Sequence, residues 1–204
     1  MSVPDAHHLF RLDITALFIL DQRTQTQNPR LAPSQIATIN EAILVRAFRA
    51  YENLLESIFL DYVQGQRTLS GVNVVSHLRP RDTAHAYEMV RSSQPFLEWN
   101  SPSTVITRCE IYLDSGGPIK TVLAAKQSLL QDIRKIRNHI AHNSRASTED
   151  YKKVVQHHLT TLPLALPTPG EFLQLNKRER NTPPRTFLRY TLDELSEIGD
   201  ALVA

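Results

Sequence analysis

An all-α fold is what the sequence predicts, and three observations predict it. Apolar residues recur three, four and seven positions apart over long stretches, as they do on the buried face of a helix. Helix-start and helix-end signals lie at the ends of these stretches. Segments that favour strands are short, so a helical bundle is the best architecture. Because the chain has 204 residues and no shift in composition, we expect one domain, residues 1–204, with a helical core at about 5–162.

The first two predicted helices are long and amphipathic. Asp5 is expected to cap a helix that runs to about Gln22. A second helix is expected from Ser34 to about Gln64, where no glycine or proline interrupts the pattern. The buried faces of the two helices are predicted to contain Phe10, Ile14, Leu17, Phe18, Ile36, Ile39, Ile43, Ala47, Ala50, Leu54 and Ile58.

Two shorter helices are predicted next along the chain. Asp82 is a plausible N-terminal cap for a helix that covers residues 84–90. Ser101 followed by Pro102 has the pattern of a cap and a first helical residue, which predicts a helix over residues 105–113.

A further helical element is predicted to open at Pro118 and to end near Asn143. Ser147, with Asp150 three residues later, predicts a new helix that runs to about His158. The apolar stripe of the element before it is predicted to contain Val122, Leu129, Ile133, Ile136 and Ile140.

The C-terminal part of the chain is predicted to differ from the rest. Residues 163–190 contain Pro163, Pro167, Pro169, Pro183 and Pro184, a density that excludes regular helix over most of this length. We therefore expect an extended strap across the body of the protein. Thr191 and Glu194 match a capping box, which predicts a short amphipathic helix at 191–203.

Composition and charge limit the classes of protein to which this chain can belong. Hydrophobic residues make up 41% of the chain and charged residues 22%, which is typical of soluble globular proteins rather than disordered or membrane ones. The apolar stretch at 12–20 is too short for an anchor and has no basic region before it. A single cysteine, Cys109, favours a reducing compartment, so we expect a cytoplasmic protein. The net charge of +2 is small, so any attraction to nucleic acid must come from local patches.

The stretch Ile136-Arg137-Asn138-His139-Ile140-Ala141-His142-Asn143 resembles the signature of the HEPN superfamily, in which an arginine and a polar residue precede a histidine. Four residues separate Arg137 from His142, which lies inside the spacing of that family. The resemblance extends more weakly over residues 35–160. Over this range the chain is similar to the RiboL-PSP branch of the superfamily. It implies an all-α HEPN-like bundle and metal-independent endoribonuclease activity that leaves a 2′,3′-cyclic phosphate and a 5′-hydroxyl.

The resemblance also implies partners and a biological setting. Such proteins often act as toxins or antiphage defence effectors that cleave tRNA or other RNA, so an antitoxin or defence-system protein is a possible partner. It points to a homodimer in which two motif helices form one composite site. It also makes Glu52, on the long second helix, a possible partner of Arg137; a solvated polar face is the alternative for Glu52.

The residue types fit this chemistry. On a helix Asn138 and His142 are four apart and share one face, and the long side chain of Arg137 reaches the same groove. A histidine can take or give a proton, and an arginine can hold a phosphate through two hydrogen bonds. We expect Arg137 to be the phosphate clamp, His142 the general acid or base, and Asn138 the orienting group. The alternative is that Arg137 and His142 only complement the dipole at a helix end.

Other histidine and cysteine roles are less well supported. His139 is a possible supporting residue, although a surface histidine is the alternative for it. His157 and His158 are adjacent and therefore expected to point to different faces, and no HExxH pattern occurs, so we expect no metal site. Cys109 has no flanking signature of a nucleophile and is expected to be buried. Glycine-rich nucleotide motifs are absent from the sequence, and no cofactor is expected.

Candidate RNA-binding cations lie in two places. Arg134 and Arg145 flank the motif, and Lys177, Arg178 and Arg180 lie in the basic strap. An ordinary solvated loop is the alternative for the strap. The rival to the nuclease as a whole is a catalytically inactive HEPN-like domain used for dimerisation or nucleotide binding, which only an activity measurement separates from the enzyme.

Overall fold

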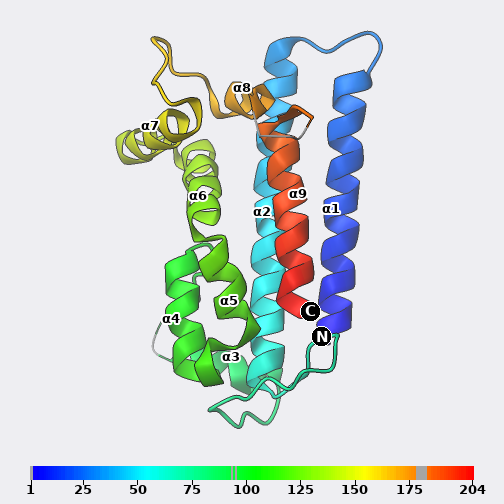
Figure 1. Cartoon of the computed structure of the whole chain (residues 1–204), viewed down its shortest axis with the longest axis vertical. Helices are drawn as coiled ribbons and strands as arrows, with labels where there is room; N and C mark the ends of the chain where they lie inside the picture. The colour runs from blue at the N-terminus through cyan, green and yellow to red at the C-terminus, as the bar shows by residue number, and fades with distance from the viewer. Residues whose placement is uncertain (1, 93, 95, 178–182) are drawn as a thin grey trace. The chain divides into compact units, whose positions relative to one another are not determined.

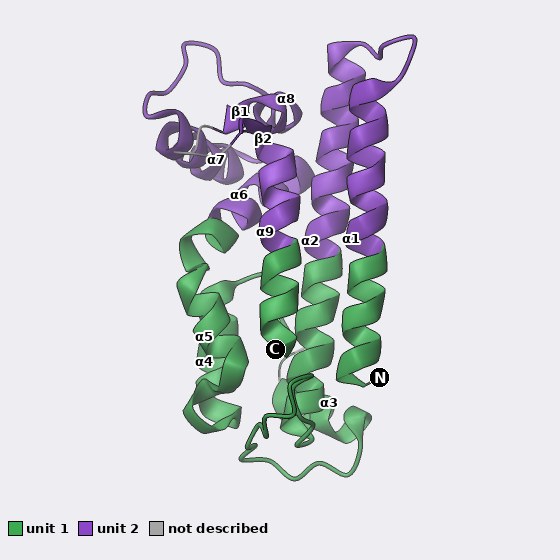
Figure 2. Cartoon of the chain, turned by 45° about the vertical axis from the view of Figure 1, so that its right-hand side comes forward, with its two compact units in different colours: residues 1–12, 50–131, 196–204 green, residues 13–49, 132–195 purple. Residues whose placement is uncertain are grey.

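The computed structural model describes residues 2–92, 94, 96–177 and 183–204, and these residues are mostly helical (Figure 1). The prediction of an all-α fold class is therefore confirmed. The chain divides into two compact units, each assembled from segments far apart in the sequence (Figure 2). Unit 1 comprises residues 1–12, 50–131 and 196–204, and unit 2 comprises residues 13–49 and 132–195. That the whole chain is one domain stays a prediction.

The elements follow one another in a simple order. The helices are α1 (Val3–Thr26), α2 (Pro33–Val63), α3 (Thr83–Arg91), α4 (Pro102–Tyr112), the 3-10 turn η1 (Asp114–Gly116), α5 (Gly117–Ala125), α6 (Gln127–His142), α7 (Arg145–Leu159), α8 (Pro169–Gln174) and α9 (Phe187–Val203). Two short strands, β1 (Asn176–Lys177) and β2 (Arg185–Thr186), pair antiparallel.

The long helices match their sequence patterns. On α1 the side chains of Phe10, Ile14 and Leu17 are buried, and Phe18 is half-buried. On α2 the expected stripe is buried except for Ile39, which is half-buried. The α3 helix begins after Asp82, whose carboxylate accepts a hydrogen bond from the backbone N–H of His85, as the cap prediction requires.

Aromatic side chains hold unit 1 around the second half of α2. The buried Tyr62 hydroxyl donates a hydrogen bond to the Leu202 carbonyl on α9 at 2.8 Å. The rings of Phe59 and Trp99 lie 5.3 Å apart, and the Arg108 guanidinium lies 4.5 Å from the Trp99 ring centre. A cation over an aromatic face stabilises the pair, so these contacts fix α4 and the segment before it against α2.

Unit 2 is held by the close approach of α8 to α2. Gly170 has no side chain, and its N–H donates to the Glu41 carboxylate on α2 at 2.9 Å. The ring of Phe172 stacks on Phe187 with centroids 4.5 Å apart, which joins α8 to the start of α9. Tyr151 of α7 packs edge-on against Phe172 at 6.1 Å, so α7 shares the same core.

Two predictions for the middle of the chain need correction. The element that opens at Pro118 is not one helix, because it breaks at Lys126 between α5 and α6. This break shifts the phase of the pattern, so Leu123 and Leu130 are fully buried and Val122 and Leu129 only half-buried.

The start of α7 also differs from the prediction. The cap is Ser144 rather than Ser147, and Ser147 is the third helical residue, whose side chain accepts from the backbone of Ser144. Ser144 and Ser147 are the two residues of a capping box, and serine is a favoured cap at either position. The sequence therefore did not distinguish the first residue of the helix.

The extended strap predicted for 163–190 is wrong in part. Thr168 and Glu171 form a capping box with Pro169 as the first residue of α8, so this proline begins a helix rather than preventing one. The terminal helix begins at Phe187, and Thr191 is buried inside it rather than capping it. The stretch 178–182 of the strap lies outside the described residues.

None of the described helices combines the length and the apolar character that crossing a bilayer requires.

Candidate functional site

The motif residues lie in the last turns of α6, within unit 2. Arg137 and Asn138 are half-buried, and His142 is exposed at the final residue of the helix. The Arg137 guanidinium donates a hydrogen bond to the Asn138 side-chain oxygen at 3.2 Å, so these two predicted residues are in contact. Within the described part of the chain, no hydrogen bond or ion pair holds the His142 side chain, which leaves its ring accessible to a ligand.

A tight turn fixes the direction of the motif. Asn143 follows His142 with a φ of 41°, in the left-handed region that asparagine tolerates better than most residues, and its N–H donates to the His139 carbonyl. Ser144 then caps α7 through the reciprocal hydrogen bonds with Ser147. The motif therefore stands at a helix–turn–helix corner with only two residues between α6 and α7.

His139 is not a surface histidine. Its relative exposure is 9%, and its ring stacks on Tyr151 of α7 with centroids 4.8 Å apart and planes 16° apart. Burial lowers the pKa of His139, although the nearby charge of Glu41 opposes that shift. The Tyr151 hydroxyl donates to the Pro167 carbonyl at 3.1 Å. His139 thus supports the corner by packing, and the periodicity could have shown this, since it lies three residues after buried Ile136.

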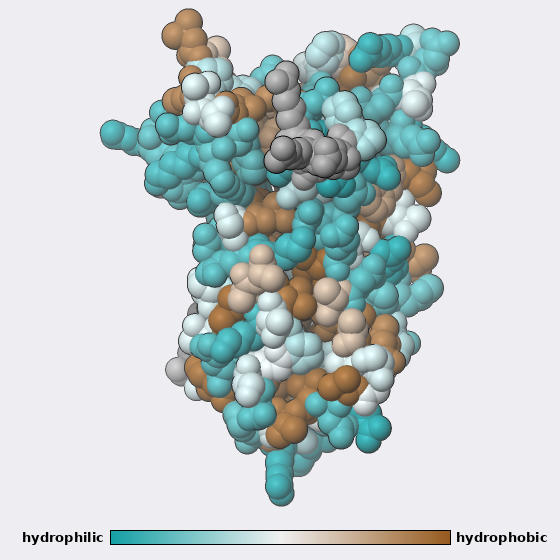
Figure 3. All heavy atoms as spheres, viewed as in Figure 1, coloured by the Kyte–Doolittle hydropathy of each residue, from teal (hydrophilic) through white to brown (hydrophobic). Residues whose placement is uncertain are grey.

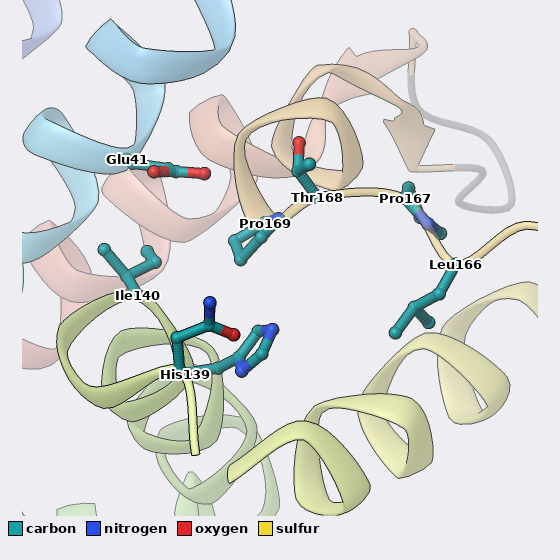
Figure 4. Close-up of a pocket in the computed structure, with 8 residues that line it drawn as sticks. Glu41, His139, Ile140, Leu166, Pro167, Thr168 and Pro169 are labelled. Atoms are coloured by element: carbon teal, nitrogen blue, oxygen red, sulfur yellow. The ribbon is translucent and has the colours of Figure 1, made fainter. Parts of the chain in front are cut away.

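A pocket of about 320 Å³ opens beside this corner. Its lining comes from α2, the end of α6 and the segment that leads into α8, and consists of Glu41, His139, Ile140, Asn143, Leu166, Pro167, Thr168 and Pro169. Figure 4 shows Glu41 and Ile140 on one side of the pocket and Leu166 and Pro167 on the other, with His139 below and Thr168 above. This volume lies in the lower part of the range for small-molecule pockets, and the lining is largely apolar with a single carboxylate.

The remaining predicted residues are distributed as follows. Arg134 is half-buried on α6, and Arg145 is exposed at the first residue of α7. Figure 3 shows a mostly hydrophilic surface over α7, in keeping with its many polar and charged residues. Glu52 is buried in unit 1, which rules out a solvated polar face, and its pairing with Arg137 of unit 2 stays a prediction.

The basic residues near the C-terminal helix make contacts inside unit 2. Lys177 places its ammonium 3.6 Å from the centre of the Tyr190 ring. Arg185 and Arg189 both form ion pairs with Asp193, and Arg189 also lies over the Phe18 ring at 4.2 Å. Part of this positive charge is therefore already compensated, and RNA binding here stays a prediction. Arg178 and Arg180 lie outside the described residues.

Cys109 is buried as expected. Burial raises the pKa of its thiol to about 12, which leaves it protonated at neutral pH and unsuited to act as a nucleophile.

A second cluster of titratable groups was missed by the sequence reasoning. The Asp132 carboxylate on α6 lies 2.9 Å from His157 Nδ1 and 3.2 Å from His158 Nε2, both on α7. Adjacent histidines were expected to diverge. They converge because His157 uses the nitrogen nearest its backbone and His158 the nitrogen farthest from it, which compensates for the angle between neighbouring positions on a helix.

The charge state of Asp132 follows from this arrangement. Burial raises its pKa, but hydrogen bonds from His158 and His157, together with the charges of His158 and Lys135, outweigh burial, so the pKa lies below the ordinary value. The carboxylate is therefore ionised at neutral pH. No pattern in the sequence indicates this cluster, because 25 residues separate Asp132 from His157. The two residues meet only because the chain turns between α6 and α7.

Comparison of the chain with protein-family models, with curated proteins and with solved structures found no match.

Proposed function

We propose that this chain is a metal-independent endoribonuclease of the HEPN type. The observation that carries the proposal is the polar group at the end of α6, where Arg137 and Asn138 are hydrogen-bonded and His142 is exposed one turn further on. The nearby pocket is lined by other residues of the same helix end, His139, Ile140 and Asn143. A toxin or antiphage defence effector, with an antitoxin or defence-system partner, is the setting that the resemblance of the motif adds.

The proposed chemistry uses these side chains alone. Arg137 holds the phosphate and stabilises the charge that builds up on it as the 2′-oxygen attacks. His142 takes the proton of the 2′-hydroxyl or gives one to the departing 5′-oxygen. Asn138, which already accepts a hydrogen bond from Arg137, keeps the guanidinium in position. The 2′-oxygen to phosphorus bond forms as the phosphorus to 5′-oxygen bond breaks, which leaves a 2′,3′-cyclic phosphate and a 5′-hydroxyl.

The pocket supports a nucleobase as the neighbouring group. Ile140, Leu166 and Pro167 offer apolar contacts to the faces of a base, and Glu41 is a hydrogen-bond acceptor for its amino groups. The same carboxylate repels phosphate, so the backbone of the RNA belongs outside the pocket. We therefore expect a preference for a base that carries an amino group next to the cleaved phosphate.

The test of the activity is incubation of the purified protein with total RNA and with defined oligonucleotides at 25 °C in excess EDTA. Cleavage should persist, because no step uses a metal, and the products should carry 2′,3′-cyclic phosphate and 5′-hydroxyl ends. Mass spectrometry identifies those ends. Strict dependence on added Mg²⁺ or Mn²⁺ would contradict the proposed chemistry, and a folded protein with no cleavage would favour the inactive HEPN-like module.

The active unit should be a homodimer with a composite site. Cleavage needs one group that accepts a proton and another that donates one, on opposite sides of the phosphorus, and one motif offers His142 as its accessible titrating group. A two-fold axis beside α6 supplies a second His142 and a second Arg137 around the same phosphate. Two-fold association is also the commonest form among soluble oligomers.

Mixing experiments separate a composite site from a monomeric one. With a ninefold excess of His142→Ala chains under subunit exchange, about one dimer in a hundred keeps two copies of His142, although about one chain in ten is wild type. Activity should therefore fall about tenfold further than dilution alone explains. Light scattering reports the mass of the active species. Activity in proportion to wild-type chains, or a monomer active at full rate, would refute the composite site.

A further inference from the structure

Asp132, His157 and His158 form a donor set that the proposed cleavage chemistry does not use. One oxygen and two imidazole nitrogens lie within 4.8 Å of one another, between the first half of α6 and the last turn of α7. The Asp132 side chain is 9% exposed and the His158 side chain 15%, whereas the His157 side chain is 60% exposed. Asp132 and His158 are thus mostly buried, whereas His157 lies at the surface. The cluster is therefore open to solvent on the side of His157.

The distances match those between ligands of one small cation. Donor atoms about 2.0–2.1 Å from a tetrahedral zinc ion lie about 3.3 Å from one another. Asp132 Oδ2 is 2.9 Å from His157 Nδ1 and 3.2 Å from His158 Nε2, and the ligand atoms of all three residues lie within 4.8 Å of one another. The two oxygen–nitrogen distances fit one metal ion, and a rotation of the imidazole rings would bring the two nitrogens to the same separation. Nitrogen and carboxylate donors favour transition metals such as zinc over magnesium or calcium, which prefer oxygen donors.

We propose that Asp132, His157 and His158 bind one Zn²⁺ ion per chain, with water in the fourth position. The metal joins the first half of α6 to the last turn of α7, away from the turn at Asn143 and Ser144 that follows the motif. It takes no part in RNA cleavage, and the proposal therefore stands or falls separately from the nuclease activity.

The surroundings favour a cation at this place. His157 and His158 lie in the last turn of α7, where the unpaired carbonyl groups give the helix end a partial negative charge. The His158 ring packs edge-on against Phe187 at 5.1 Å, which orients it toward Asp132. Lys135 lies 3.6 Å from the other carboxylate oxygen, Oδ1, and its partly exposed side chain can move away or remain bonded to Oδ1 while Oδ2 holds the metal.

The direct test is titration of the EDTA-treated, then desalted, full-length protein with ZnCl₂ by calorimetry. One Zn²⁺ should bind per chain, and a hundredfold excess over Kd should raise Tm by roughly 5–10 °C. Because outer partners of metal ligands alone change metal affinity about 10–100-fold, loss of a ligand in His157→Ala should weaken binding at least that much. Co²⁺ should give the visible absorption bands of a low-symmetry site, and MgCl₂ should not bind.

Controls separate this site from general histidine affinity. His157 is largely exposed, so His157→Ala should keep the helical circular dichroism spectrum, and it is the main variant for that reason. His8→Ala removes an exposed histidine outside the cluster and should bind zinc like the wild type. A stoichiometry well below one, equal loss in His8→Ala, or unchanged affinity in a folded His157→Ala and His158→Gln double variant would each overturn the zinc site.

Discussion

Replacing His142 with alanine should lower the rate of RNA cleavage by about 10²–10⁴-fold, the usual range for a residue that transfers a proton in the transition state. Replacing Arg137 should have an effect of similar size, because the charge on the pentacoordinate phosphate would lose its bidentate donor. Initial rates on a defined oligonucleotide in EDTA measure both. The oligonucleotide removes differences in RNA quality between preparations.

The same two substitutions should hardly change the stability of the fold. His142 is exposed and Arg137 half-buried, and substitutions at such positions usually change the free energy of unfolding by less than about 0.5 kcal/mol. His8→Ala and Arg23→Ala, which remove exposed residues of the same types on α1, are matched controls and should cleave at the wild-type rate. If His142→Ala cleaved normally, or lost several degrees of Tm, the residue would have a structural role at the helix end instead.

The helices whose interior carries an uninterrupted apolar pattern were predictable. The bounds of α2 agree with the sequence within about one residue, because 3.6-residue periodicity and the lack of internal glycine or proline act together over its whole length. The break at Lys126 and the α8 helix were missed for opposite reasons. Lys126 carries no breaker signal, whereas Pro169 looked like one although it stands at the first helical position, where proline is favoured.

The candidate site was predictable only where it depends on one helix. The shared face of Asn138 and His142 follows from their spacing, and the contact of Arg137 with Asn138 is between neighbours. The stacking of His139 on Tyr151, the pocket next to Glu41 and the cluster around Asp132 depend on how α2, α6, α7 and α8 meet. Such contacts between distant segments leave no periodic signal in a single sequence.

Gly170 of α8 packs directly against the backbone of α2, next to the pocket. A Cβ atom at Gly170 would lie 2.5 Å from the carbonyl carbon of Ala37 on α2 and closer still to its oxygen. Both atoms belong to the α2 backbone, which cannot move aside as a side chain can. The Gly170→Ala variant must therefore shift α8 away and break the hydrogen bond from Gly170 to Glu41.

We expect Gly170→Ala to destabilise the fold by about 3 kcal/mol, near the upper end of what overpacking usually costs. For a chain of this length that lowers Tm by roughly 6–12 °C. Denaturant titration followed by circular dichroism measures the loss. Gly71→Ala is the matched control, because a Cβ there meets nothing within 4 Å and the cost comes from its φ of +87° alone, about 1–2 kcal/mol. A loss at Gly170 no larger than at Gly71 would mean that α8 does not pack on α2 as closely as described, and the pocket beside Glu41 would then lack its upper wall.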